Sequence, residues 1–332
     1  MVIRTLSQNP WETSTRSALV RISTHSLFIS TSGPPRHPGS PVVLFFTGGG
    51  APSALYLRLQ RLLSVRHRVY FHDRAGYGDS ELGPGGTGIH LGTMLTAQTA
   101  ARELGELLDV IGVAPPYILL SHSYGSICAR AFAGLFDPMQ PSVAGMVLAE
   151  SATELMFELF QPSVPPPAFT AIARGVDIEA VTHEMERSRL TDQELAYVKA
   201  QLKKSARGSA LEKPRLSAKR LLREQQFARQ VLGNAPLSVI CADFTKDFRL
   251  IFEAGVRMGN GTRAEREECT RFFEQAQMFN DELRAGQLRL SGCNRFRKVL
   301  EEGHSLPITH PEILVEEVQW VVDHLKGRVS GH

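Results

Sequence analysis

A pentapeptide centred on serine, Ser121-His122-Ser123-Tyr124-Gly125, constrains the possible folds of this chain more than any other segment. It ends the apolar run 117–122 (YILLSH) and precedes a helical pattern over 126–136 that begins with small residues. A strand that turns sharply into a helix projects the central side chain above the carboxyl edge of a sheet. The small residues at 121 and 125 let the strand and the helix approach closely. The pentapeptide therefore predicts a strand–turn–helix unit that presents the Ser123 hydroxyl.

Strand-like and helical patterns alternate along most of the chain. Two short runs within 18–32 predict an antiparallel hairpin, and apolar residues in 97–111 recur at the three- and four-residue spacing of an amphipathic helix. The other predicted strands are continuous apolar runs, the type buried on both faces of a parallel sheet. They lie at 41–46, 67–73, 117–122, 143–150, 236–243 and 296–300. The alternation predicts an α/β fold with a mostly parallel sheet and helices on both faces.

The alternation stops for a long stretch in the middle of the chain. Residues 151–235 show helical patterns, a proline-rich segment at 162–167 and no convincing strand. A second helical excursion covers 248–284, before the last strand. We therefore expect a core in two parts, 18–150 and 236–326, with 151–235 inserted between them as a helical lid.

Composition excludes several classes of protein. The chain has 332 residues, 42% of them hydrophobic, which is enough for a large core. Its 37 Lys and Arg against 34 Asp and Glu give a net charge of +3, too small for the charge footprint of a nucleic-acid binder. No apolar run approaches the roughly 20 residues of a membrane span, and no signal peptide is visible, so we expect a cytoplasmic protein. Four scattered cysteines without a CxxC pair argue against a disulfide framework or a structural zinc site.

Five segments of the chain resemble the α/β-hydrolase-fold superfamily, and the resemblance runs from about Ala18 to Leu325. They are VVLFFTGGG, FHDRAGYGDS, ILLSHSYGSICARAFA, VAGMVLAES and EEGHSLPITHPEIL. The resemblance implies an eight-stranded sheet, Ser123 as a nucleophile, and neither a metal nor an organic cofactor. Relatives usually have glycine where this chain has Ser121. DRAGYGDS is similar to the D-R-x-G-x-G-x-S signature of these enzymes, in which Gly76 and Gly78 suit a tight turn.

The family carries its catalytic histidine after the last strand. Gly303-His304 follows that predicted strand and precedes the closing helix, so the resemblance assigns His304 as the base. His310 is the alternative, but Pro311 ties it to the entry of the helix.

The acid of the predicted triad has three candidates. Most relatives place it after the seventh strand, where the usual position in this chain is Thr245, with Asp243 two residues early and Asp247 two residues late. Haloalkane dehalogenases and certain lipases instead carry it directly after the sixth strand. Glu150 occupies that place in MVLAES, so we expect Glu150, with Asp243 and then Asp247 as alternatives.

Backbone amides are expected to form the oxyanion hole. The amide of Tyr124 lies at the predicted helix N-terminus, where it is free to donate to a developing negative charge. The second donor is expected in the loop Thr47-Gly48-Gly49-Gly50, at Gly48 or Gly49. Because the backbone supplies the bond, the side chains there are not decisive.

Two features of the predicted lid allow two interpretations each. Its apolar side chains either line an acyl- or polyketide-sized pocket or form the core of the lid itself. Between 183 and 230, twelve Lys and Arg stand against six Asp and Glu. This surplus is either a solvated helix face or a surface that recognises a carboxylate or an acidic carrier. The apolar side chains are Met156, Phe157, Leu159, Phe160, Phe169 and Met185.

The resemblance and the motifs together predict a serine hydrolase that cleaves an ester, thioester or lactone of an apolar small molecule through an acyl-enzyme. A serine nucleophile argues against epoxide hydrolysis and dehalogenation, which use a carboxylate in this fold. The alternatives are a lyase or cyclase of natural-product biosynthesis and a non-catalytic small-ligand receptor. Nothing in the sequence indicates an oligomeric state.

Overall fold

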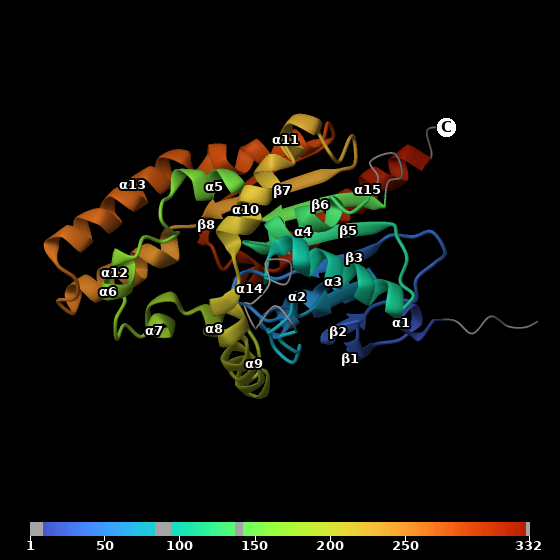
Figure 1. Cartoon of the computed structure of the whole chain (residues 1–332), viewed down its shortest axis with the longest axis horizontal. Helices are drawn as coiled ribbons and strands as arrows, with labels where there is room; N and C mark the ends of the chain where they lie inside the picture. The colour runs from blue at the N-terminus through green and yellow to red at the C-terminus, as the bar shows by residue number, and fades with distance from the viewer. Residues whose placement is uncertain (1–8, 84–93, 137–141, 330–332) are drawn as a thin grey trace, which may run out of the picture.

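The computed structural model describes residues 9–83, 94–136 and 142–329. Its strands are β1 (Arg16–Arg21), β2 (Ser26–Ser32), β3 (Val42–Phe46), β4 (Val69–His72), β5 (Tyr117–His122), β6 (Val143–Ala149), β7 (Leu237–Asp243) and β8 (Asn294–Gly303). Within these ranges they form one eight-stranded sheet in the order β1-β2-β4-β3-β5-β6-β7-β8 (Figure 1). β2 runs antiparallel to β1 and β4, and the other neighbouring strands are parallel. The predicted mostly parallel sheet is confirmed.

Helices of very different lengths connect the strands. Before β6 they are α1 (Pro10–Thr13), α2 (Leu57–Ser64), α3 (Ala97–Val110) and α4 (Gly125–Ala133). Between β6 and β7 they are α5 (Glu154–Leu159), α6 (Ala168–Ile172), α7 (Ile178–Thr182), α8 (Glu184–Arg187), α9 (Asp192–Leu211), α10 (Pro214–Arg223) and α11 (Gln226–Arg229). After β7 they are α12 (Lys246–Arg257), α13 (Arg263–Ala285), α14 (Leu306–Thr309) and α15 (Glu312–Val329). We call α5 to α11 the inserted helices.

Helix α3 shows how local sequence and burial agree in this fold. Its N-cap is Thr96, whose side chain accepts a hydrogen bond from the amide of Thr99 and so satisfies a free donor of the first turn. Leu104, Leu107 and Leu108 are buried on one side of the helix, as the three- and four-residue spacing predicts. This apolar stripe fixes α3 against the sheet.

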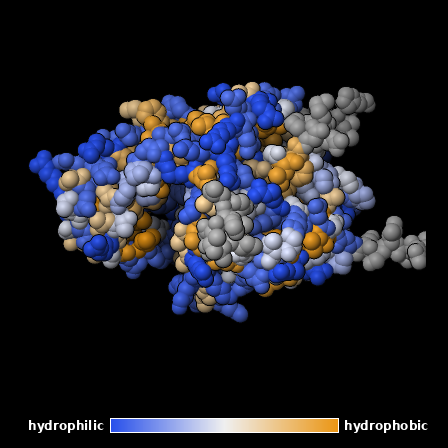
Figure 2. Space-filling model, in the orientation of Figure 1, coloured by the Kyte–Doolittle hydropathy of each residue, from blue (hydrophilic) through white to orange (hydrophobic). Residues whose placement is uncertain are grey.

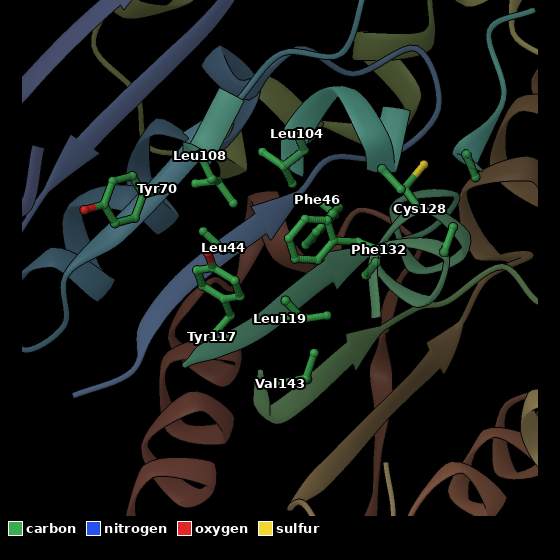
Figure 3. Packing of buried hydrophobic residues seen from close by; sticks show 14 of the residues in the cluster. Leu44, Phe46, Tyr70, Leu104, Leu108, Tyr117, Leu119, Cys128, Phe132 and Val143 are labelled. Carbon is green, nitrogen blue, oxygen red and sulfur yellow. The ribbon is translucent and has the colours of Figure 1, made fainter. Parts of the chain in front are cut away.

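Both faces of the sheet are covered by helices. On one face α3 and α4 lie over β3 and β5, where Leu44, Phe46 and Leu119 meet Leu104 and Phe132 (Figure 3). On the other face α2 and α15 pack against the opposite side chains of the same strands. This second cluster includes Val43, Phe45, Leu59, Leu63, Ile118, Leu120, Leu314 and Val318. Burial on both faces explains why β3 and β5 are continuous apolar runs.

A third apolar cluster lies beyond the sheet and is largely aromatic. It joins α5 and α6 to α12 and α13, which lie together at one end of the molecule (Figure 1). Its rings make edge-to-face contacts, with centroids 5.3 Å apart for Phe160 and Phe272 and for Phe169 and Phe248. Such contacts stabilise a cluster beyond the area that they bury.

The six apolar side chains expected either to line a pocket or to form a lid core occupy different surroundings. Met156, Phe160 and Phe169 are buried in the aromatic cluster. The other three are distributed as follows: Phe157 packs against the cluster on the α3–α4 face, Met185 packs against the cluster on the α2–α15 face, and Leu159 is 39% exposed. Half of the set therefore belongs to a packed core.

Strand β8 is longer than the sequence predicts. It covers Asn294–Gly303 rather than 296–300, and it therefore runs directly into His304. The excursion predicted at 248–284 consists of α12 and α13.

None of the helices in the described ranges combines the length and the apolar character that crossing a bilayer requires.

The surface visible in Figure 2 is mostly hydrophilic, with apolar residues in small separate patches. Such scattered apolar side chains are normal for a folded protein.

The basic surplus between 183 and 230 is carried mainly by exposed side chains of α9 and α10. They are Lys199, Lys203, Lys204, Arg207, Lys219 and Arg223.

A buried ion pair links α4 to the first inserted helix. The Nη1 and Nη2 atoms of Arg130 donate to the carboxylate of Glu154 at 2.6 and 2.8 Å, and both side chains are almost fully buried. Gln226 accepts a further bond from Arg130 Nε at 3.1 Å. Because removal of one member leaves an uncompensated buried charge, such a pair is sensitive to single substitutions.

We therefore expect Glu154→Gln to lower the free energy of unfolding by about 3 kcal/mol, measured by urea denaturation. The control is Glu267→Gln, which breaks the exposed pair between Arg263 and Glu267 on α13. That change should stay within about 0.5 kcal/mol of the unsubstituted protein. Equal losses in the two variants would contradict the importance of the buried pair.

Candidate active site

The candidate nucleophile lies in the turn between β5 and α4. Ser123 has a φ of 53°, a left-handed conformation that is strained for a residue with a side chain. Its amide donates to the carbonyl of Ala149 at 3.1 Å, which fixes the turn. A Cβ atom at Gly125 would lie 2.2 Å from the carbonyl oxygen of Phe46, so only glycine fits there. The turn holds the Ser123 hydroxyl at the carboxyl edge of the sheet.

Ser121 replaces the usual glycine without leaving its hydroxyl unpaired. The side chain is fully buried, and its Oγ lies 2.9 Å from the Oγ of Ser126 and 3.5 Å from the carbonyl oxygen of Val147. A buried hydroxyl with hydrogen-bond partners carries little cost.

Ser123, His304 and Glu150 form a connected chain. His304 Nε2 lies 2.9 Å from Ser123 Oγ, and His304 Nδ1 lies 3.4 Å from Glu150 Oε2. The three residues follow β5, β8 and β6, whose carboxyl ends meet at one edge of the sheet. With Nδ1–H directed at the carboxylate, Nε2 is free to accept the serine proton.

Glu150 is fully buried at the end of β6. One oxygen, Oε1, accepts from the amide of Ala242 at 2.5 Å and lies 3.4 Å from Arg284 Nε. Burial by itself raises the pKa of a carboxyl group, but Arg284, His304 and the Ala242 amide outweigh it and hold the pKa of Glu150 below its usual range. Glu150 is therefore ionised at neutral pH.

The other acid candidates lie beside Gly303, the residue before His304, but within the described residues no hydrogen bond joins either of them to the imidazole. Asp243 accepts from the amide and hydroxyl of Thr245 at 3.0 and 2.7 Å, and it pairs with Arg249. Asp247 lies against Gly303, where a Cβ atom would come within 2.7 Å of Oδ2. The structure thus brings Glu150, and not Asp243, to His304.

His310, the alternative base, also lies away from the nucleophile. Its Nδ1 lies 3.2 Å from Glu302 Oε2 and 3.3 Å from the hydroxyl of Thr309, and 40% of the side chain is exposed. The structure brings His304 to Ser123 and places His310 at the entry of α15.

The backbone amides expected to form an oxyanion hole lie beside the nucleophile. Tyr124 is the N-cap of α4, and an added Cβ atom at Gly49 would lie 3.6 Å from the Cβ of Tyr124. At Gly48 an added Cβ atom would lie 3.5 Å from the Cβ of Ser123. The Gly48 amide donates weakly to the Tyr56 hydroxyl, at 3.3 Å. Among the candidates, the amides of Gly49 and Tyr124 have no hydrogen-bond partner within the described residues, so both are free to donate to a ligand.

Arg74 fixes the shape of the loop that contains Gly48 and Gly49. Its Nη1 donates to the carbonyl of Thr47 at 2.7 Å, and its Nη2 donates to the carbonyl of Gly48 at 3.0 Å. Its Nε donates at 2.7 Å to Glu212, which lies between α9 and α10. The hydroxyl of Tyr77 donates to Glu212 at 2.6 Å and accepts from the Gly50 amide at 3.0 Å.

His122 connects this loop to the histidine loop. Its Nε2 donates to the carbonyl of His304 at 2.9 Å, so its Nδ1 accepts from the hydroxyl of Tyr56 at 2.7 Å. Complete burial, together with the nearby His304, lowers the pKa of His122 to about 3, and the ring stays neutral. His122 is a fixed structural link here.

Sequence reasoning missed several residues of this site. For Arg74 a signal existed, since it lies inside DRAGYGDS, where only the glycines were interpreted. His122 lies within the serine pentapeptide, but its partners are distant in sequence. Arg284 gives no signal, because nothing in α13 marks it as a neighbour of Glu150. In the described part of the chain, no group of three or more His, Cys, Asp or Glu side chains can hold a metal ion.

Comparisons with known proteins identify the family of this chain. The model of the alpha/beta hydrolase family matches residues 43–317. An AB hydrolase superfamily protein of Gibberella zeae is 31% identical over 330 residues, which cover 95% of this chain and 98% of that protein. A protein of Hormonema carpetanum described as probable transporter efuK is 32% identical over 334 residues. This chain is covered to 97% in that match but spans only 45% of the relative.

Solved structures share the fold at low sequence identity. A putative epoxide hydrolase from Pseudomonas aeruginosa has a TM-score of 0.60 at 14% identity and covers 94% of this chain and 97% of its own. A putative lipase from Acinetobacter baumannii AYE has a TM-score of 0.60 at 12% identity, with 97% and 95% covered. From its family match, its relatives and its sheet, the chain belongs to the alpha/beta hydrolase family.

Proposed function

We propose that this hydrolase cleaves an ester, thioester or lactone of an apolar small molecule through a Ser-His-Glu triad. The observation that carries the proposal is the 2.9 Å separation of Ser123 Oγ and His304 Nε2, with the buried Glu150 carboxylate behind the imidazole. A nucleophile within hydrogen-bond reach of a base that is oriented by a third group is the arrangement that acyl transfer requires.

In the acylation step Ser123 Oγ attacks the substrate carbonyl while His304 Nε2 takes its proton. Glu150 keeps Nδ1 protonated and stabilises the imidazolium that forms. The amides of Tyr124 and of Gly49 or Gly48 donate to the tetrahedral oxyanion, each worth about 3 kcal/mol in the transition state.

Collapse of this intermediate breaks the bond to the leaving alcohol or thiol, which receives the proton from His304. Water, or a hydroxyl of the substrate itself, then attacks the acyl-enzyme and gives its proton to His304. The second intermediate releases the carboxylic acid or lactone and restores the Ser123 hydroxyl, so neither an oxidant nor a cofactor is consumed.

The inserted helices act as a lid in this proposal. Glu184 of α8 accepts from the hydroxyl of Ser305 at 2.5 Å, and Arg187 of α8 pairs with Glu302 at 2.5 Å. These two contacts attach α8 to the histidine loop, one before His304 and one after it in the sequence. In support of an apolar substrate, the aromatic cluster of α5, α6, α12 and α13 includes Phe244, the residue directly after β7, and the Phe244 ring contacts Arg284 beside Glu150.

Epoxide hydrolysis is less well supported, although solved neighbours are described as putative epoxide hydrolases. Their identities of 15 and 14% concern the fold alone. A hydroxyl at position 123 favours acyl transfer, because opening of an epoxide on this fold calls for a carboxylate nucleophile.

Replacement of the nucleophile tests the proposal directly. We expect Ser123→Ala to abolish labelling by a fluorophosphonate probe and to lower turnover of p-nitrophenyl esters by at least about 10³-fold. Ser126→Ala, one helical turn away, should remain labelled. Undiminished labelling of the Ser123→Ala protein would overturn the nucleophile assignment.

Replacement of the base distinguishes the two C-terminal histidines. His304→Ala should lower kcat at least about 10³-fold, because the hydroxyl loses its proton acceptor. His310→Ala should stay close to the unsubstituted protein in the same ester assay. The reverse pattern would show that the base was wrongly assigned.

The acid is tested by a paired kinetic comparison. Glu150→Gln should keep a trace of activity but lose most of kcat, since an orienting acid is partly replaceable, whereas Asp243→Asn should stay within about tenfold. Circular dichroism confirms that both variants are folded. A crippled Asp243→Asn protein with an active Glu150→Gln protein would move the acid to β7, and two mild variants would contradict the triad itself.

A further inference from the structure

Arg284, near the end of α13, is a fully buried cation beside Glu150. Its Nε lies 3.4 Å from Glu150 Oε1, and both side chains have no solvent exposure. Its guanidinium carbon lies over the ring of Phe244, 4.7 Å from the ring centroid, so an aromatic side chain packs against the guanidinium group. Within the described residues none of its side-chain nitrogen atoms has a hydrogen-bond partner. The carboxylate of Glu150 is therefore the countercharge that its burial depends on.

The two oxygens of Glu150 face different partners. Oε1 faces Arg284 and the amide of Ala242, while Oε2 faces His304. A carboxylate removed from water is strongly disfavoured in its charged form unless an opposite charge is close. Arg284 supplies that charge on the side of Glu150 away from the imidazole, and it limits how the carboxylate can rotate.

We propose that Arg284 is a positioning residue of the triad, which keeps Glu150 ionised and turned with one oxygen toward His304. The inference rests on the proposed function, because it gives Arg284 a role only through Glu150 and His304. It adds to the triad a residue from α13, an element that supplies none of the other three.

The protonation state of Glu150 decides which tautomer His304 adopts. An ionised Glu150 accepts from Nδ1–H and leaves Nε2 free to take the Ser123 proton. A protonated Glu150 donates to Nδ1 instead, and the neutral ring then carries its hydrogen on Nε2. In that state His304 cannot act as the base. Loss of the Arg284 charge should therefore inactivate the enzyme at acidic pH.

The other ionisable groups around Glu150 do not replace Arg284. Burial lowers the pKa of His122 to about 3 and raises that of the Cys241 thiol to about 12, so both groups are neutral at working pH. Glu184 on α8, whose pKa is raised by burial, and Asp247 on α12 lie on the side of His304, and neither can supply a positive charge. Asp281, next to Cys241, is paired with Lys298. Among the residues that the structure describes, Arg284 is the permanent cation in contact with the acid.

The test measures the rate of fluorophosphonate labelling as a function of pH in the 332-residue chain. Removal of the cation makes proton uptake by the Glu150–His304 pair easier. The acid limb of the profile should therefore move to higher pH by about 1 to 3 units in Arg284→Gln. On the alkaline plateau its rate should return to within about tenfold of the unsubstituted protein. Arg284→Lys keeps a positive charge and should retain an acid limb close to the original one.

Arg68→Met is the matched control for loss of a buried arginine. Arg68 is 3% exposed at the amino end of β4, and it donates to the carbonyls of Pro34, Ser14 and Gly33. Its loss should lower stability and leave the pH profile unchanged. A purely structural role for Arg284 would give the same result in Arg284→Gln, and that result would overturn the inference.

A double variant keeps the test decisive if Arg284→Gln folds poorly. Glu150→Gln alone leaves Arg284 buried without its countercharge, so its urea midpoint should fall. Glu150→Gln combined with Arg284→Met removes both charges and should recover part of that midpoint without recovering labelling. Additive losses would contradict the coupling. If the fluorophosphonate probe labelled neither the unsubstituted protein nor a normally folded Arg284→Lys protein, the proposed function itself would be contradicted. The role of Arg284, which rests on that function, would fall with it.

Discussion

The close approach of α4 to the end of β3 is the constraint on which the site depends. Gly125 lies so near the carbonyl oxygens of Phe46 and Thr47 that no side chain fits at that position. This approach forces Ser123 into a left-handed conformation and aims its hydroxyl over the edge where β5, β6 and β8 end. The strain at Ser123 is tolerated because two apolar clusters fix the strands and helices around the turn.

In the described parts of the chain, three buried ion pairs join segments that are distant in sequence. Arg130 with Glu154 links α4 to α5, Arg74 with Glu212 links the loop after β4 to the segment between α9 and α10, and Arg284 with Glu150 links α13 to the end of β6. A desolvated charge needs its partner close by, so each pair restrains the relative position of the two segments that it joins. Two of the three lie directly behind residues of the proposed site.

The inserted helices are connected to both loops of the proposed catalytic apparatus. Glu212 holds Arg74, which in turn holds the carbonyls of Thr47 and Gly48, and Glu184 holds Ser305 next to His304. Movement of α8 would therefore shift the loop that carries the imidazole, and movement of the α9–α10 segment would shift the loop that carries the proposed oxyanion donors. In the proposed mechanism this makes the lid part of the site as well as its cover.

Local sequence determined the alternation of strands and helices, the strand–turn–helix unit at Ser123 and the candidacy of His304. These features depend on residue spacing, on small residues at a turn and on order along the chain. The choice among Glu150, Asp243 and Asp247 needed the tertiary structure, because it depends on which carboxylate reaches the imidazole once β6, β7 and β8 are side by side. Arg284, His122 and Arg74 could not be placed from sequence either, since each acts through partners brought near only by folding. Residue spacing along the chain determines the strands and helices. Which charged side chains meet is decided only in the folded core, because a charge that is removed from water needs an opposite charge beside it.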